Sequence, residues 1–206
     1  MINIDSFYVT RFALALSNVT LLSMQKSKIL STKAAHTKPD PIPKLECFKE
    51  LLNKDSNILD VGCGNGYMSK RFSEIVGNSG NIYALDTDKV SIDILRREIL
   101  NPNLEALTGD ITKKTIFQNE FFDLVYLSTV IHIFSKSQIE RFCEETKRIL
   151  KPKFQLAIVN FKKEDVPFGP PVDSRLSPDE LAQRLSFTPG KCIEAGKHFY
   201  MQIFLL

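Results

Sequence analysis

The sequence lacks the cysteine patterns that bind zinc or cross-link small extracellular domains. Its 206 residues contain four cysteines, Cys47, Cys63, Cys143 and Cys192. They lie far apart, with no Cys-x-x-Cys pair and no Cys/His cluster, which argues against a zinc site of the usual spacing and against a dense disulfide framework. Free thiols are typical of a reducing compartment. The sequence therefore predicts a cytoplasmic protein, and it indicates no metal site.

Glycine and proline are also few, and neither sign of charge predominates. Nine glycines and ten prolines exclude collagen-like and low-complexity chains. Hydrophobic residues make up 43% and charged residues 25%, as in an ordinary globular protein. Lysine and arginine exceed aspartate and glutamate by 27 to 24, a net charge of +3. Dedicated nucleic-acid binders usually have a stronger basic bias, so the composition carries no strong nucleic-acid signal.

No apolar run has the length and purity of a membrane span. The most apolar stretch, residues 7–24, is interrupted by Arg11 and several polar side chains, whereas a transmembrane helix needs about 20 predominantly apolar residues. The only charge before this stretch is Asp5, so the basic start of a signal peptide is missing too. We expect an amphipathic helix that packs on the domain or on a partner, with membrane association as the alternative.

What the chain does contain is a regular alternation of strands and helices that follows a connector. Residues 27–44 are polar, and three prolines at alternate positions prevent a helix there. We therefore expect an N-terminal helix and connector over residues 1–44. A short helix over residues 45–52 then opens a single domain that extends to residue 206.

Hydrophobic patterning places the elements of this domain. Strands are expected at Asn57–Val61, Asn81–Leu85, Leu104–Thr108, Phe122–Ser128, Phe154–Phe161, Lys191–Ala195 and Phe199–Leu205. Helices are expected at Tyr67–Val76, Lys89–Leu100 and Ser135–Leu150, and a further helix starts at Ser177-Pro178. The alternation predicts an α/β fold with a doubly wound, mostly parallel seven-stranded sheet, closed by a C-terminal antiparallel hairpin.

The most informative stretch joins a buried strand to a helix through three glycines. It reads Asp60-Val61-Gly62-Cys63-Gly64-Asn65-Gly66. Glycines without a β-carbon let the backbone approach a ligand closely and adopt unusual dihedral angles. Asp86 follows twenty residues after Gly66, at the end of the next strand, where a carboxylate can accept hydrogen bonds from ribose hydroxyls. The pair predicts a nucleoside-containing ligand, and a glycine turn without a ligand is the alternative.

This stretch resembles motif I of the class I S-adenosylmethionine-dependent methyltransferases. Three further motifs of that family follow in order: Gly109-Asp110-Ile111, Phe122–Ser128 and Leu150-Lys151-Pro152. One departure is Lys153-Phe154, where many members have two glycines. The resemblance covers residues 45–206. It implies the Rossmann-like methyltransferase fold, S-adenosylmethionine as cofactor and methyl transfer as the activity.

The same glycine spacing weighs against a different class of enzyme. The dinucleotide-binding fingerprint G-x-G-x-x-G would need its third glycine at position 67, which is Tyr67. A nicotinamide-dependent oxidoreductase is therefore disfavoured. A methyltransferase-fold protein without activity, which binds a partner through its N-terminal helix, remains the alternative function.

The resemblance also implies which residues hold the cofactor. Gly62, Gly64 and Gly66 would surround its methionine part, and Asp60 would order the loop or bind the amino group. Asp86 would accept hydrogen bonds from the ribose hydroxyls. The full expected set of cofactor-binding residues is Asp60, Gly62, Cys63, Gly64, Gly66, Asp86, Thr87, Asp110, Ile111, Ser128 and Thr129. Of these, Asp110 and Ile111 would hold the adenine, and Ser128 and Thr129 would lie near the sulfonium.

The residues after the fourth expected strand limit the class of molecule that could accept the methyl group. Ser128-Thr129-Val130-Ile131-His132 lacks the Asn/Asp-Pro-Pro-Tyr/Phe signature of DNA amino-methylating enzymes, and no cysteine of the chain follows a proline, as the cytosine-C5 family requires. The region is similar to the ubiquinone/menaquinone-biosynthesis branch, which implies a small-molecule acceptor. His132 is the candidate catalytic base, because imidazole titrates near neutral pH. Alternatively, His132 only packs or forms a structural hydrogen bond.

A second unusual stretch, Asn160–Pro171, follows the fifth strand at the same edge of the expected sheet. Its prolines would make it a rigid loop that forms an acceptor wall or a lid, with Phe168 and Arg175 facing the substrate. The alternative is a solvated connector that exposes the pair Lys162-Lys163.

Overall fold

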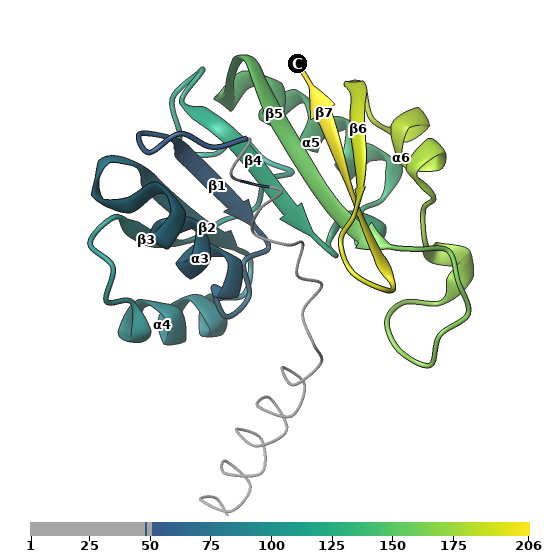
Figure 1. Ribbon diagram of the computed structural model, residues 1–206, viewed down its shortest axis with the longest axis horizontal. Coiled ribbons are helices and arrows are strands. Elements are labelled where there is room, and N and C mark those ends of the chain that lie inside the picture. The colour runs from purple at the N-terminus through teal and green to yellow at the C-terminus, as the bar shows by residue number, and fades with distance from the viewer. Residues whose placement is uncertain (1–47, 49–50) are drawn as a thin grey trace, which may run out of the picture. The chain divides into compact units, whose positions relative to one another are not determined.

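The computed structural model describes residue 48 and residues 51–206, which form an α/β domain on one seven-stranded sheet (Figure 1). The strands are β1 (Asn57–Val61), β2 (Asn81–Asp86), β3 (Leu104–Thr108), β4 (Phe122–Ser128), β5 (Leu150–Phe161), β6 (Thr188–Glu194) and β7 (Phe199–Leu205). Their order is β3-β2-β1-β4-β5-β7-β6, parallel except where β7 pairs with β5 and β6. The predicted sheet and hairpin are confirmed. The predicted segment 1–44, and most of the helix predicted over residues 45–52, lie outside the described residues.

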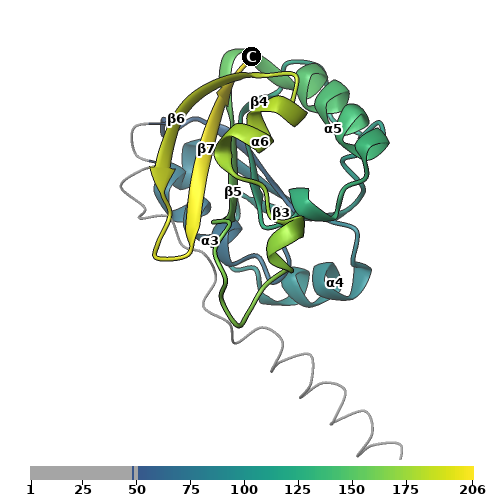
Figure 2. The same ribbon diagram turned by 90° about the vertical axis from the view of Figure 1, so that its right-hand side faces the viewer.

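Helices cover both faces of this sheet. They are α3 (Tyr67–Val76), α4 (Lys89–Glu98), α5 (Lys136–Ile149) and α6 (Pro178–Arg184). Apolar side chains of α3 and α4 belong to one core cluster, and those of α5 and α6 belong to the other. Figure 2 views the sheet from its β6–β7 edge and shows α5 and α6 on one side of the strands. Because both faces are covered, a central strand such as β4 is buried almost throughout.

The alternation of side chains along each strand divides the core into these two clusters. On the α3 face, the rings of Phe48, Phe72 and Tyr126 pack edge to face, with centroids 5.1–5.6 Å apart. On the α5 face, Leu59 and Leu127 lie in the same cluster as Phe142 and are fully buried. Two buried faces fix the register of the sheet, because a slip by one residue would exchange them.

Side-chain caps start the helices where the sequence predicts. The hydroxyl of Ser135 accepts a hydrogen bond from the Gln138 N–H, and the Gln138 side chain accepts one from the Ser135 N–H. Ser177 and Glu180 form the same capping box at α6. Each box satisfies two N–H groups that a helix start otherwise leaves unpaired.

The predicted start of β5 at Phe154 is wrong, since the strand begins at Leu150 directly after α5. Leu150 pairs with Phe122, the register then shifts, and Leu124 pairs with Gln155. Lys153 has a φ of 68° inside this irregularity. Pairing of β5 with β7 begins only at Gln155, so Pro152 removes no hydrogen bond from that ladder. A bulge of this kind leaves no periodic signal in the sequence.

Two other predicted boundaries also shift. Helix α4 ends at Glu98, two residues before the predicted Leu100. Strand β6 begins at Thr188 and includes Pro189, because β6 lies at the edge of the sheet where proline is tolerated. At the opposite edge, the Nε of Arg96 on α4 donates to the carbonyl of Ala106 on β3 at 2.9 Å.

The connection between β3 and β4 is unlike the other connections between parallel strands, since residues 109–121 contain no helix. Its buried side chains, Ile111 and Phe117, belong to the core cluster on the α5 face. Within residue 48 and residues 51–206, no helix has the length and apolar character needed to cross a membrane.

Candidate functional site

The glycine loop turns sharply at the end of β1. Gly62, Gly64 and Gly66 have φ values of 69°, 53° and 73°, a region that favours glycine. The N–H groups of Gly62 and Cys63 both donate to the carbonyl of Leu85, at 2.7 and 3.2 Å. The loop therefore folds over the end of β2, and Gly66 becomes the N-cap of α3.

Two of these glycines also lack space for a side chain. A β-carbon on Gly62 would lie 2.4 Å from a methyl group of Val130, and one on Gly66 would lie 2.5 Å from a methyl group of Leu95. A β-carbon on Gly64 would meet no atom within 4 Å. Packing against the protein thus requires Gly62 and Gly66, whereas the space beside Gly64 is open to a ligand.

The Asp86 carboxylate braces this loop. Its Oδ2 accepts a hydrogen bond from the Gly64 N–H at 2.9 Å, and its Oδ1 accepts one from the Asp88 N–H at 2.9 Å. Asp88 in turn caps α4 by accepting from the N–H groups of Val90 and Ser91. One carboxylate therefore links the loop after β1 to the start of the helix after β2.

Asp60 and Cys63 point into the protein. The Asp60 side chain is 2% exposed and accepts a hydrogen bond from the Ser69 hydroxyl on α3. Of its two expected roles, this geometry favours the ordering of the loop. Burial raises the pKa of the Cys63 thiol well above its usual range, and the charges of Asp60 and Asp86 raise it further. The thiol is therefore protonated at neutral pH and unreactive.

A pocket of about 320 Å³ opens beside the loop, at the carboxyl ends of the parallel strands. Five of the predicted cofactor-binding residues line it: Gly62, Asp86, Thr87, Asp110 and Ile111. The pocket lining does not include the other six: Asp60, Cys63, Gly64, Gly66, Ser128 and Thr129. Besides β-strand ends, the lining takes in residues that the sequence did not single out, namely Val130, Ile133, Phe134 and Gln138.

Thr129 explains why the residues after β4 reach this pocket. It has a φ of 54°, which is uncommon for a residue other than glycine, and its N–H still donates to the carbonyl of Val159 at 2.9 Å. The chain turns there, so that Val130 faces Gly62 and a short 3-10 turn, Ile131–Ile133, follows. Strained positions of this kind often lie at ligand sites.

Asp110 holds its own loop together. Its Oδ1 accepts hydrogen bonds from the N–H and hydroxyl of Thr112 at 2.9 and 2.7 Å, and Lys113 lies 3.5 Å from its Oδ2. Partial burial alone would raise the pKa of Asp110, but the bonds from Thr112 and the charge of Lys113 outweigh it and hold the pKa below its usual value. Asp110 is therefore ionised at neutral pH.

His132 lies in the 3-10 turn next to this pocket and does not line it. Its Nδ1 is buried and has no hydrogen-bond partner among the residues that the structure describes. Its ring meets Phe161 edge to face, with centroids 6.4 Å apart. Burial lowers the pKa of His132 below 6.5, so the imidazole is neutral at pH 7 and able to accept a proton.

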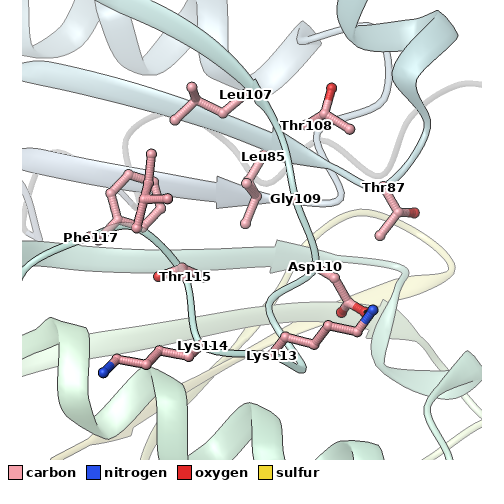
Figure 3. Close-up of a pocket in the computed structure, with 11 residues that line it drawn as sticks. Leu85, Thr87, Leu107, Thr108, Gly109, Asp110, Lys113, Lys114, Thr115 and Phe117 are labelled. Carbon is pink, nitrogen blue, oxygen red and sulfur yellow. The ribbon is translucent and has the colours of Figure 1, made fainter.

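A second cavity, of about 530 Å³, adjoins the first (Figure 3). The two share Leu85, Thr87, Gly109 and Asp110. The larger one extends under residues 113–117, along the face of β2 and β3.

Comparison with known proteins points to one family of enzymes. A family model described as a methyltransferase domain matches residues 58–153. A crystal structure of an S-adenosylmethionine-dependent methyltransferase from Aquifex aeolicus is similar over 80% of this chain and 88% of its own, at 28% identity and a TM-score of 0.71. These matches support an assignment to the class I S-adenosylmethionine-dependent methyltransferases. Their cofactor is S-adenosylmethionine.

Curated methyltransferases match shorter parts of the chain. A probable cobalt-precorrin-6B C(15)-methyltransferase (decarboxylating) from Saccharolobus solfataricus is 31% identical over 93 residues, which are 43% of this chain and 46% of that protein. A ubiquinone/menaquinone biosynthesis C-methyltransferase from Coxiella burnetii is 27% identical over 127 residues, 57% of this chain and 50% of that protein. The methyltransferase described here thus spans about half the length of these relatives.

The structure contradicts one of the expectations drawn for the loop after β5. The expectation that Arg175 faces the substrate is wrong, since this side chain is 2% exposed. Its guanidinium donates to the carbonyls of Pro170, Glu164 and Phe168 at 2.6–2.9 Å and lies over the Phe161 ring. Arg175 therefore holds the loop of the methyltransferase from inside.

The lysine pair of this loop is not free either. Lys162 forms an ion pair with Glu194 on β6 at 2.8 Å, and Lys163 forms one with Glu180 on α6 at 2.6 Å. Together with Arg175, these bonds connect the loop to its neighbours on several sides. The loop after β5 is thus held by Arg175 from inside and by two ion pairs at the surface, and Lys163 is exposed, as in the alternative of a solvated connector.

Proposed function

We propose that this methyltransferase transfers the methyl group of S-adenosylmethionine to a small-molecule acceptor. The observation that carries the proposal is the glycine loop beside the 320 Å³ pocket, braced by Asp86 and left open at Gly64. Fold similarity alone would not support an activity, because one fold serves many functions. The proposal rests on Gly62 and Asp86, which line one pocket, and on the open backbone of Gly64 beside it.

The residues of this pocket fit the cofactor. The open face of Gly64 lets the backbone approach the methionine part, and Asp86, whose oxygens already order the loop, would accept hydrogen bonds from the ribose hydroxyls. Asp110 and Ile111 would border the adenine, as would Thr87. When bound, S-adenosylmethionine supplies an electrophilic methyl group on a sulfonium.

The acceptor would enter from the side of the 3-10 turn. There the lining is mainly apolar, with Val130, Phe134 and Ile133, whose side chain is 68% exposed. We infer a small and largely apolar acceptor on this side of the pocket. Alignment of its nucleophilic atom with the methyl group can supply about 7–11 kcal/mol of the barrier reduction without any acid or base.

We propose His132 as the base where the acceptor must lose a proton. Its neutral imidazole and its position next to the pocket support this role. Ser128 and Thr129 would shape the backbone near the sulfonium, since Thr129 sets the turn that precedes Val130. A small-molecule acceptor is also what the names of the precorrin and quinone methyltransferases describe for those proteins.

Two further parts of the proposal rest on the sequence. The three cysteines of the described residues, Cys63, Cys143 and Cys192, are free thiols, in keeping with a cytoplasmic location. The division into an N-terminal segment 1–44 and a catalytic domain 45–206 likewise stays a prediction.

Calorimetric titration with S-adenosylmethionine and, separately, with S-adenosylhomocysteine tests the cofactor site. We expect micromolar binding of both. Absence of binding to a folded sample would contradict the proposal and favour the inactive scaffold. Incubation with methyl-labelled S-adenosylmethionine and a panel of small apolar acceptors then tests transfer, with S-adenosylhomocysteine release as the readout.

A further inference from the structure

The connection between β3 and β4 borders a cavity. The other connections between parallel strands carry helices whose apolar side chains pack on the sheet. Residues 113–117 form one wall of the 530 Å³ cavity, and Leu85 and Leu107 of the sheet form the opposite side (Figure 3). Ile116 in this wall is 84% exposed. A segment beside a cavity lacks packing contacts on that side. The buried apolar side chains of this connection, Ile111 and Phe117, therefore fix only the two ends of the segment between them.

Polar side chains of α5 hold the middle of this segment, around Thr115. Glu145 is 6% exposed, and its Oε1 accepts hydrogen bonds from the N–H of Thr115 at 2.7 Å and from the Thr115 hydroxyl at 2.5 Å. Burial alone would raise the pKa of Glu145, but the bonds from Arg148 and Thr115 outweigh it and keep the pKa below its usual value. Glu145 is thus a buried anion bonded directly to the backbone of the cavity wall.

Arg148 completes the attachment. Its guanidinium bonds both oxygens of Glu145, at 2.6 and 2.8 Å, and donates to the carbonyl of Phe117 at 2.8 Å and to Oδ1 of Asn119 at 2.9 Å. A planar guanidinium with several donors suits such a forked arrangement better than an ammonium group does. About two turns before Arg148 on α5, Arg141 donates to the carbonyl of Thr112 at 3.2 Å.

These contacts reach the cofactor pocket through Thr112. Asp110 accepts hydrogen bonds from both the N–H and the hydroxyl of Thr112, while Arg141 holds the Thr112 carbonyl. Asp110 and Ile111 line the 320 Å³ pocket. The chain of contacts therefore runs from α5 to the residues proposed to border the adenine.

We propose that Glu145 and Arg148 are positioning residues for the cofactor site. From α5 they hold residues 112–119, and through this segment they hold Asp110 and Ile111 in the conformation that binds the adenine side. This inference rests on the proposed function. If only a fraction of molecules has the segment in place, the apparent dissociation constant rises by the inverse of that fraction.

The experiment compares Glu145→Gln with Glu144→Gln, its exposed neighbour on the same helix. S-adenosylhomocysteine affinity is measured by calorimetry, and amide hydrogen exchange of residues 112–119 is measured with and without S-adenosylhomocysteine. We expect about tenfold weaker binding for Glu145→Gln, with faster exchange in residues 112–119 that saturating ligand reverses. Glu144→Gln should match the wild type in both measurements.

Two milder variants keep the test decisive if Glu145→Gln does not fold. Thr115→Val removes one hydrogen bond to Glu145 and leaves the ion pair, and Arg148→Lys keeps the charge but loses the fork. Both should weaken S-adenosylhomocysteine binding, Thr115→Val by less than Arg148→Lys. A purely structural role would lower the melting temperature and leave the affinity unchanged. Wild-type affinity in the folded variants would overturn this inference alone, and a wild type that binds no S-adenosylhomocysteine would overturn the proposed function together with it.

Discussion

The Asp86 carboxylate accepts a hydrogen bond from the backbone N–H of Gly64, 22 residues earlier in the chain, at 2.9 Å. Its other oxygen accepts from the N–H of Asp88. This carboxylate would therefore act twice, first by ordering the glycine loop and then by binding the ribose. A variant at position 86 should affect both the shape of the loop and the affinity for the cofactor.

Asp86→Ala should weaken S-adenosylhomocysteine binding by about 10- to 100-fold, equivalent to about 1.5–3 kcal/mol for lost charge-assisted hydrogen bonds. Asp86→Asn should lose less affinity for S-adenosylhomocysteine, because an amide oxygen can still accept a hydrogen bond from the Gly64 N–H. Calorimetric titration checks both, with Asp165→Ala at an exposed position as the control. Unchanged affinity in Asp86→Ala would show that the ribose assignment is wrong.

Gly62→Ala and Gly64→Ala should separate folding from binding. The added methyl group at position 62 meets Val130 at 2.4 Å in a left-handed conformation, so we expect a loss of about 2–4 kcal/mol in the free energy of unfolding. At position 64 no protein atom lies within 4 Å, and only the backbone strain of about 1–2 kcal/mol remains. Urea unfolding measures this difference. Gly64→Ala should nevertheless lose most S-adenosylhomocysteine affinity, and retention of full affinity would contradict the proposed cradle.

Arg175→Met should loosen the loop after β5. The loop carbonyls of Glu164, Phe168 and Pro170 would lose their donor, at a cost of about 3 kcal/mol in stability. Trypsin should then cleave faster after Lys162 and Lys163. Arg184→Met, on the exposed part of α6, is the control. Equal cleavage of both variants would mean that other contacts hold the loop.

His132→Asn should change how stability depends on pH. The pKa of His132 is lowered in the folded protein, so below pH 6.5 the unfolded state binds the proton more readily and the free energy of unfolding falls. We expect a shallower loss of stability between pH 7 and pH 5.5 in His132→Asn than in the wild type. Urea midpoints at several pH values check this, with His198→Asn as the matched control. Identical pH profiles for the wild type and His132→Asn would contradict the burial of a neutral imidazole.

Most of the fold could be predicted because it depends on short-range patterns. The strands Asn57–Val61 and Phe122–Ser128 are mostly apolar and short, and their observed bounds match the predicted ones. The glycine loop and Asp86 could be found for the same reason, since their spacing follows directly from one strand–turn–helix unit and the end of the next strand. These features need no knowledge of distant contacts.

The remaining parts of the site depend on contacts between distant segments. Val130 reaches the pocket only because Thr129 takes a left-handed conformation, for which threonine gives no sequence signal. Arg175 looked like a substrate-facing charge, but carbonyls of the preceding loop satisfy it inside the protein. No local pattern shows such a partner, because a carbonyl belongs to every residue.

The way Arg175 holds the loop after β5 determines which substitutions this loop can tolerate. Its guanidinium bonds main-chain oxygens, which stay in place whatever side chains the loop carries. The exposed side chains of this loop, such as Asp165 and Asp173, can then be exchanged without loss of its support. Sequence variation in this loop is therefore compatible with one backbone conformation, as long as Arg175 is kept.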